Sequence, residues 1–117
     1  MRILIAASLL IIVAAQAARA HAFLDHASPA VGSRVTQAPA VVTLWFTQQL
    51  EPAFSTVEIV DGGGRRVDLG LQVDATDPTV LHVAVKPLPP GTYRVEWRVV
   101  SVDTHTTTGH FIFEVGG

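Results

Sequence analysis

The chain has 117 residues, the length of a single domain, and it carries eight basic against ten acidic residues. It has no lysine- or arginine-rich stripe, which excludes nucleic acid as an expected partner. Cysteine is absent, so neither a disulfide nor a thiolate metal site can stabilise the fold.

The first twenty residues have the pattern of a secretory signal peptide. Arg2 supplies a positive start, residues 3–15 are almost entirely apolar, and Ala18-Arg19-Ala20 is an A-x-A cleavage pattern. The apolar run is too short to span a bilayer comfortably, although an uncleaved anchor is the alternative interpretation. We expect residues 1–20 to be removed, which leaves residues 21–117 as a periplasmic domain that does not span the membrane.

Apolar and polar residues alternate through most of the remaining chain, which predicts strands. The Asp61-Gly62-Gly63-Gly64 stretch is typical of a hairpin turn, with 66–69 pairing back across it. Tyr93 follows a Pro-Gly corner, as in the tyrosine corner of immunoglobulin-like sandwiches. The fold class is therefore all-β, a sandwich or barrel of about seven strands. The expected strands are 21–26, 41–47, 55–60, 66–69, 79–85, 93–100 and 111–115.

A metal-binding pattern lies between the last two expected strands. Asp103 and His105 are two residues apart, so in an extended backbone their side chains project to the same face. A carboxylate and an imidazole at the end of a rigid strand provide two of the ligands that a metal site needs. A third ligand has to come from elsewhere in the chain.

Signal cleavage would make His21 the first residue, with its α-amine and ring nitrogen both available to one metal ion. Ordinary pKa values of about 8 and about 6.5 for these two groups let a metal displace their protons near neutral pH. Together with Asp103 and His105, the set becomes three nitrogens and one oxygen, which suits Cu(II). The only methionine is Met1, so no sulfur ligand favours Cu(I). We predict one Cu(II) ion.

Three motifs extend this pattern over essentially all of the expected mature chain. They are residues 21–33, which begin His21-Ala22-Phe23-Leu24-Asp25-His26, then Leu44-Trp45-Phe46-Thr47 with Glu51-Pro52-Ala53-Phe54-Ser55, and Pro90–His105 followed by Gly109-His110-Phe111. These motifs resemble those of the CopC family of periplasmic copper-resistance proteins. That resemblance implies a Greek-key β-sandwich or barrel, described as immunoglobulin-like or cupredoxin-like, that holds Cu(II) through His21, Asp103 and His105. The methionine-rich loop of some members is missing, which implies a Cu(II)-only member.

The remaining polar residues near these motifs have weaker assignments. Gln48 stands where some CopC proteins have an acidic residue, so it is a candidate for supporting the site by hydrogen bonding. His110 is a second such candidate, close in sequence to His105. We expect His26 and His82 to be surface residues, with His82 solvated on an outward strand face.

Three functions are compatible with these patterns. The first is a non-enzymatic, monomeric copper carrier or buffer that exchanges metal with a CopD-like inner-membrane transporter or another periplasmic copper protein. The second is a copper oxidoreductase acting on polysaccharides, and the third is a metal-free immunoglobulin-like interaction module. A carboxylate ligand such as Asp103 stabilises Cu(II) over Cu(I) and disfavours redox cycling, so we expect the first.

Overall fold

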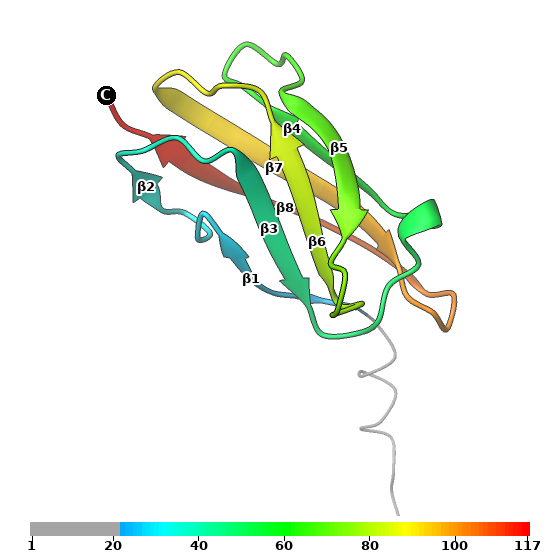
Figure 1. Ribbon diagram of the computed structural model, residues 1–117. Coiled ribbons are helices and arrows are strands. Elements are labelled where there is room, and N and C mark those ends of the chain that lie inside the picture. Colours follow the sequence, from blue (N-terminus) through cyan, green and yellow to red (C-terminus); the bar gives the residue numbers. More distant parts are fainter. Residues whose placement is uncertain (1–21) are drawn as a thin grey trace, which may run out of the picture.

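A computed structural model describes residues 22–117; the predicted signal peptide and His21 lie outside the described residues. Eight strands and one short 3-10 turn, η2 (Pro52–Phe54), make up the described chain (Figure 1). The strands are β1 (Leu24–Ser28), β2 (Arg34–Val35), β3 (Val41–Phe46), β4 (Thr56–Val60), β5 (Asp68–Val73), β6 (Val80–Val85), β7 (Gly91–Val100) and β8 (Thr106–Val115). Among the described residues, no helix is both long and apolar enough to cross a bilayer.

The strands form two four-stranded sheets, in the orders β1-β3-β6-β5 and β2-β8-β7-β4. The chain crosses repeatedly from one sheet to the other, as in a Greek key, and the two sheets lie face to face (Figure 1). The prediction of an all-β sandwich is confirmed. The strand beyond the expected seven is β2, a two-residue strand that pairs parallel to the end of β8.

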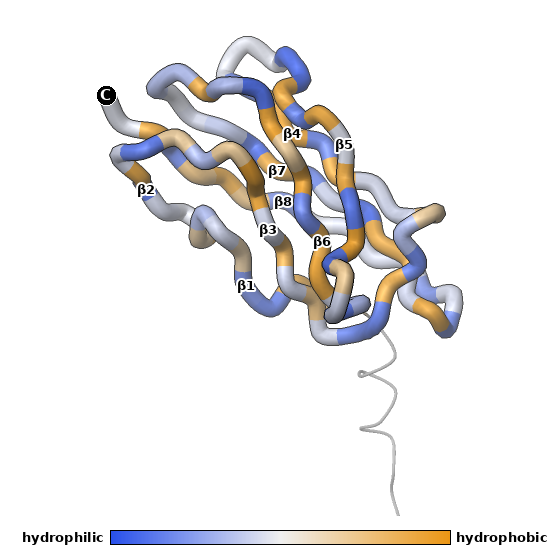
Figure 2. The backbone as a smooth tube through the Cα atoms, in the orientation of Figure 1, coloured by the Kyte–Doolittle hydropathy of each residue, from blue (hydrophilic) through white to orange (hydrophobic). Residues whose placement is uncertain are grey.

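The core lies between the sheets and follows the predicted alternation. Apolar and polar residues alternate along the strands (Figure 2), and the apolar ones face inward. Burial of each large apolar side chain stabilises the fold by about 1.5–3 kcal/mol. Phe46 and Trp97 meet edge to face across the core, with ring centroids 5.2 Å apart. The buried positions include Val42, Leu44, Phe46, Leu81, Val83, Val85, Tyr93, Val95, Trp97, Val99, Phe111, Phe113 and Val115.

The tyrosine corner is present as predicted. The Tyr93 side chain is buried, and its hydroxyl donates a hydrogen bond of 2.5 Å to the carbonyl oxygen of Pro89, four residues earlier. This bond fixes the corner from which the long strand β7 begins.

The predicted hairpin after β4 forms only at its start. Arg66 makes an antiparallel bridge with Val60, and the Val67 amide donates to the Ile59 carbonyl at 2.8 Å, but the pairing does not continue to residue 69. The chain then changes sheets, because β5 pairs with β6 while β4 pairs with β7. The Asp68 carboxylate accepts a hydrogen bond from the Ile59 amide at 2.9 Å, which holds the two strands together where they diverge.

Four segments meet at one end of the sandwich, which we call the Asp103 end. They are residues 22–23, 47–55, 74–79 and 101–105. The strand register places them together, because Leu24 pairs with Phe46, Trp45 with Val80 and Val100 with Thr106. A bridge between Leu50 and Ser101 connects the two sheets at this end.

His82 is not simply solvated, contrary to the prediction. It is half-buried, its Nε2 lies 2.6 Å from Asp74 Oδ1, and its Nδ1 lies 3.0 Å from the Thr43 hydroxyl. His26 is exposed as expected and stacks on Trp45 with ring centroids 4.3 Å apart. Polar partners on two other segments therefore hold the His82 ring, whereas His26 lies against Trp45 and has its polar contact with the adjacent Asp25.

The Asp74–His82 contact predicts a loss of stability in acid. The hydrogen bond to His82, helped by the Thr76 amide, lowers the pKa of Asp74 from 3.8 to about 2. A carboxylate with a depressed pKa stabilises the fold above its ordinary pKa, and that stabilisation disappears as the pH falls from about 4 to about 2. In urea unfolding, the stability gap between the wild type and Asp74→Asn should shrink over this range. A gap that stays constant from pH 6 to pH 2 would contradict the assignment.

Close packing of Gly109 against Trp97 predicts a large effect of one methyl group. A Cβ at Gly109 would overlap Cζ2 of the Trp97 indole and lie 2.7 Å from its Cε2. Gly109→Ala should therefore lower the free energy of unfolding by about 1–3 kcal/mol, measured by denaturant titration. Gly62→Ala is the matched control, since nothing lies within 4 Å of its new Cβ. Equal stabilities of the two variants would show that the contact does not limit packing.

Candidate metal site

The loop between β7 and β8 is a tight, hydrogen-bonded turn. The Ser101 amide donates to the His105 carbonyl at 2.9 Å, and the Thr104 amide donates to the Ser101 carbonyl at 2.8 Å. Thr104 has a φ of 71°, in the left-handed region that a β-branched residue rarely adopts. Such a conformation costs about 1–3 kcal/mol and recurs at functional sites. The turn therefore fixes the positions of Asp103 and His105 relative to each other.

Asp103 and His105 lie in contact within this turn. The His105 Nδ1 is 3.1 Å from Asp103 Oδ1, and the two side chains are 49% and 44% exposed. The prediction that they share one face is right in outcome, but the reason differs. They meet because the backbone turns between them, rather than by alternation along an extended strand.

Asp103 is held as a carboxylate. The Ser101 hydroxyl donates to Asp103 Oδ1, and the His105 amide approaches the same oxygen at 3.4 Å. The Ser101 hydrogen bond, and after it the bond with the His105 ring, lower the pKa of Asp103 below its ordinary value of 3.8. The Asp103 carboxylate is therefore deprotonated at neutral pH, the form that a metal ligand needs.

The first described residue is fixed beside this pair. The Thr107 hydroxyl donates a 2.5 Å hydrogen bond to the carbonyl oxygen of the buried Ala22. Phe23 is held by Thr47, whose hydroxyl accepts from the Phe23 amide at 3.0 Å and whose amide donates to the Phe23 carbonyl at 2.9 Å. The chain that follows His21 thus enters the fold two residues beyond His105 on β8.

Gln48 lies in the segment between these contacts. It is half-buried and sits between Thr47, which binds Phe23, and Gln49, whose carbonyl accepts from the Val102 amide at 3.0 Å. The structure therefore brings the segment around Gln48 to the same end of the sandwich as Asp103 and His105.

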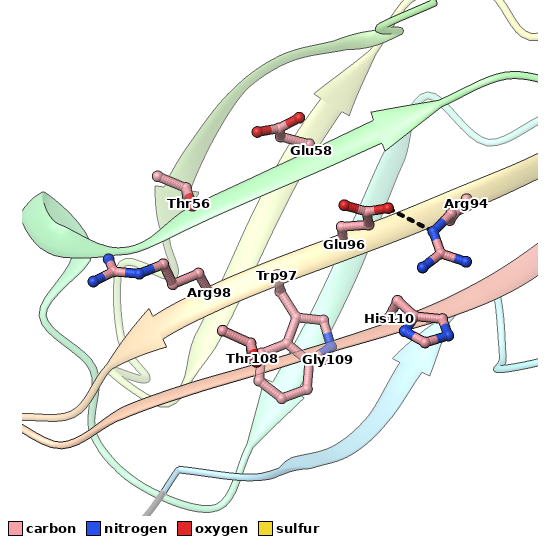
Figure 3. A pocket seen from close by; sticks show the side chains of 9 residues that line it. All are labelled: Thr56, Glu58, Arg94, Glu96, Trp97, Arg98, Thr108, Gly109 and His110. Carbon is pink, nitrogen blue, oxygen red and sulfur yellow. Dashed lines mark hydrogen bonds and ion pairs between the residues drawn. The ribbon is translucent and has the colours of Figure 1, made fainter. Parts of the chain in front are cut away.

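His110 lies elsewhere. It pairs with Glu96 on the outer face of the second sheet, beside Arg94 (Figure 3). Along β8 it is four residues past Thr106, a rise of about 13 Å. The structure does not bring His110 to the Asp103–His105 pair.

Ser101 and Thr107 have positional roles that we did not assign from the sequence. Both belong to the hydroxyl-rich stretch 101–108, and this composition was the one sequence feature that pointed to them. Hydroxyl residues are common in turns, so composition alone did not single out these two. In the described residues 22–117, no group of three or more histidine, aspartate or glutamate side chains could hold a metal ion.

The family model of the CopC domain matches residues 24–116. The chain belongs to the CopC family. Its curated relatives include the protein YobA of Escherichia coli K12, which is 41% identical over 82% of this chain and 79% of its own length. Copper resistance protein C of Xanthomonas campestris pv. juglandis is 35% identical over 97% of this chain and 91% of its own length.

Two further matches extend the comparison. The copper transport protein CutJ of Bacillus subtilis is 32% identical over 83% of this chain, but the match covers only 18% of CutJ. The crystal structure of CopC from Methylosinus trichosporium OB3b superposes with a TM-score of 0.78 at 36% identity, over 82% of this chain and 94% of that one. The sandwich seen here is thus the fold of a solved CopC protein.

The Ser101 hydrogen bond predicts a measurable change in the acidity of Asp103. Ser101→Ala removes the largest cause of the lowered pKa, so the pKa of Asp103 should rise toward 3.8. The measurement is a carboxyl-carbon NMR titration of the metal-free protein. An Asp103 titration curve that is unchanged in the variant would show that the hydroxyl does not act on this carboxylate.

Proposed function

We propose that this CopC-family chain is a periplasmic Cu(II)-binding protein that acts as a carrier or buffer in copper homeostasis. The single observation behind this proposal is the hydrogen bond from Thr107 to Ala22, which fixes the start of the described chain beside the Asp103–His105 pair. Membership of the CopC family and the copper-resistance and copper-transport names of its relatives support copper as the cargo.

The proposed ligands are the α-amine and imidazole of His21, the Asp103 carboxylate and the His105 imidazole. Neighbouring Cα atoms are about 3.8 Å apart, so residue 21 is covalently tied to a position that Thr107 holds next to the site. Asp103 and His105 alone are too few, because tetragonal Cu(II) uses about four close ligands. Three nitrogens and one oxygen complete that set for a single Cu(II) ion.

Cleavage of the signal peptide after Ala20 is part of the same proposal, since it creates the α-amine. Gln48 supports the site from its segment between Thr47 and Gln49, as a hydrogen-bonding side chain that adds no charge. We assign no catalytic role, and the protein acts as a monomer.

The proposed exchange partner is a CopD-like copper transporter of the inner membrane. The match to CutJ supports it, because there a segment similar to this chain forms part of a much longer copper transport protein. A separate small domain that serves such a transporter must release its copper as well as bind it. The half-exposed Asp103 and His105 side chains suit that requirement.

A residue added ahead of His21 tests the proposal. The extension moves the α-amine away from the histidine ring, so Cu(II) affinity should fall at least about tenfold relative to the protein that begins at His21. Competitive Cu(II) titration gives the affinity. Electron paramagnetic resonance should show altered copper parameters in the extended protein, in His105→Ala and in Asp103→Ala.

His26→Ala is the matched control, because it removes an exposed imidazole that stacks on Trp45 on the outer face of the first sheet. Its Cu(II) affinity and spectrum should equal those of the wild type. Unchanged affinity in the extended protein, or loss of affinity in His26→Ala, would contradict the proposed ligand set.

A further inference from the structure

Charge is distributed unevenly between the two ends of the sandwich. The segments of the Asp103 end and the adjoining start of β1 contain no lysine or arginine among the described residues. The nearest basic side chain in the sequence is Arg98, which lies within β7. The carboxylates of this end are Asp25, Glu51, Asp74, Asp77 and Asp103.

The opposite end carries basic side chains, most of them ion-paired. Residues 29–40, 61–67, 86–90 and 116–117 form it. Three of its arginines pair with carboxylates there: Arg34 with Glu114, Arg65 with Asp61 and Arg66 with Asp68. The ten-residue strand β7 separates the two ends by about 33 Å, several times the Debye length of about 8 Å at physiological salt. A partner bound at one end is therefore largely screened from the charges of the other end. The basic residues of the opposite end are Arg34, Arg65, Arg66 and Lys86.

The acidic end also exposes large apolar side chains. Phe54 is 66% exposed, Phe23 50% and Val102 47%. They belong to three different segments that hydrogen bonds draw together: Phe23 binds Thr47, and the Val102 amide binds the Gln49 carbonyl. Phe54 ends η2, which begins just after Glu51, whose amide donates to the Val100 carbonyl at 2.8 Å. Exposed aromatic side chains within a charged surround mark protein interaction surfaces.

We propose that the Asp103 end is a docking surface for a copper-exchanging protein whose contact face is basic around an apolar centre. Charge complementarity selects such a partner, because like charge would repel an acidic one. Phe23, Phe54 and Val102 supply the apolar contacts, and the carboxylates steer the approach. The inference rests on the proposed function in one respect: the Asp103–His105 pair lies within this surface, so docking brings the partner to the metal.

Two designed peptides serve as probes. Both begin with Gly-Gly-His, which chelates Cu(II), and they continue with alternating lysine and leucine or with alternating glutamate and leucine. Copper transfer from the loaded protein should be at least about tenfold faster to the basic peptide in about 20 mM salt, and this difference should nearly vanish in about 300 mM salt. Association of the same peptides with the metal-free protein is measured in parallel by amide NMR shifts.

Variants outside the proposed ligand set localise the surface. Glu51→Gln should slow transfer to the basic peptide about two- to threefold at low salt, whereas Glu114→Gln, with the same charge change far from the site, should not. Phe54→Ser should weaken association of the lysine–leucine peptide but not of a lysine–serine version. All three variants should keep the wild-type Cu(II) spectrum.

The outcomes separate this inference from the proposed function. Equal transfer to both peptides, or equal effects of Glu51→Gln and Glu114→Gln, overturns the docking surface even if copper binding is intact. Failure to bind copper with peptide association intact overturns the proposed function and leaves the surface. Concentration-dependent dimerisation in sedimentation, abolished by Glu51→Gln, would instead show that a second copy of this chain covers the surface, which overturns the proposed partner.

Discussion

The proposed copper site depends on the hydrogen bond from the Thr107 hydroxyl to the Ala22 carbonyl. This bond ties the first described residue to β8, next to the turn that carries Asp103 and His105. It joins residues 85 positions apart and holds Ala22 against the first residues of β8. Ala22 is fully buried, so its carbonyl would lose a partner without Thr107, at a cost of about 1–3 kcal/mol. The proposed copper site needs this contact as well as Asp103 and His105, because the contact ties the first described residue to the strand beside them.

The paired strands β7 and β8 hold Thr107 in position for that contact. Thr107 lies in the paired region of β7 and β8, where Val99 is its cross-strand neighbour in the core. The turn that carries Asp103 and His105 is therefore attached to the longest strand pair of the fold. The proposed ligands Asp103 and His105 thus belong to a hydrogen-bonded turn between two long paired strands, and such preorganisation reduces the ordering cost of binding.

The sequence was sufficient for the fold class and for most of the core, because alternation specifies which residues face inward. The sequence was not sufficient to predict which strands pair. Alternation after Arg66 indicates a strand but not its partner, and it is packing that makes β5 pair with β6. The spacing of Asp103 and His105 pointed to the site, yet their contact arises from a turn with Thr104 in the left-handed region. The roles of Ser101 and Thr107 depend on partners distant in space. His82 was misjudged for the same reason, since Asp74 belongs to a loop that alternation does not place.

The most direct test of the proposed ligand set is a crystal structure of the Cu(II)-loaded protein that begins at His21, with an anomalous map at the copper absorption edge. The ligand set predicts one copper peak at the Asp103 end, about 2 Å from the α-nitrogen and a ring nitrogen of residue 21, a ring nitrogen of His105 and a carboxylate oxygen of Asp103. A copper peak elsewhere, on His26 or on His110 for example, with the amine of residue 21 unligated, would contradict it.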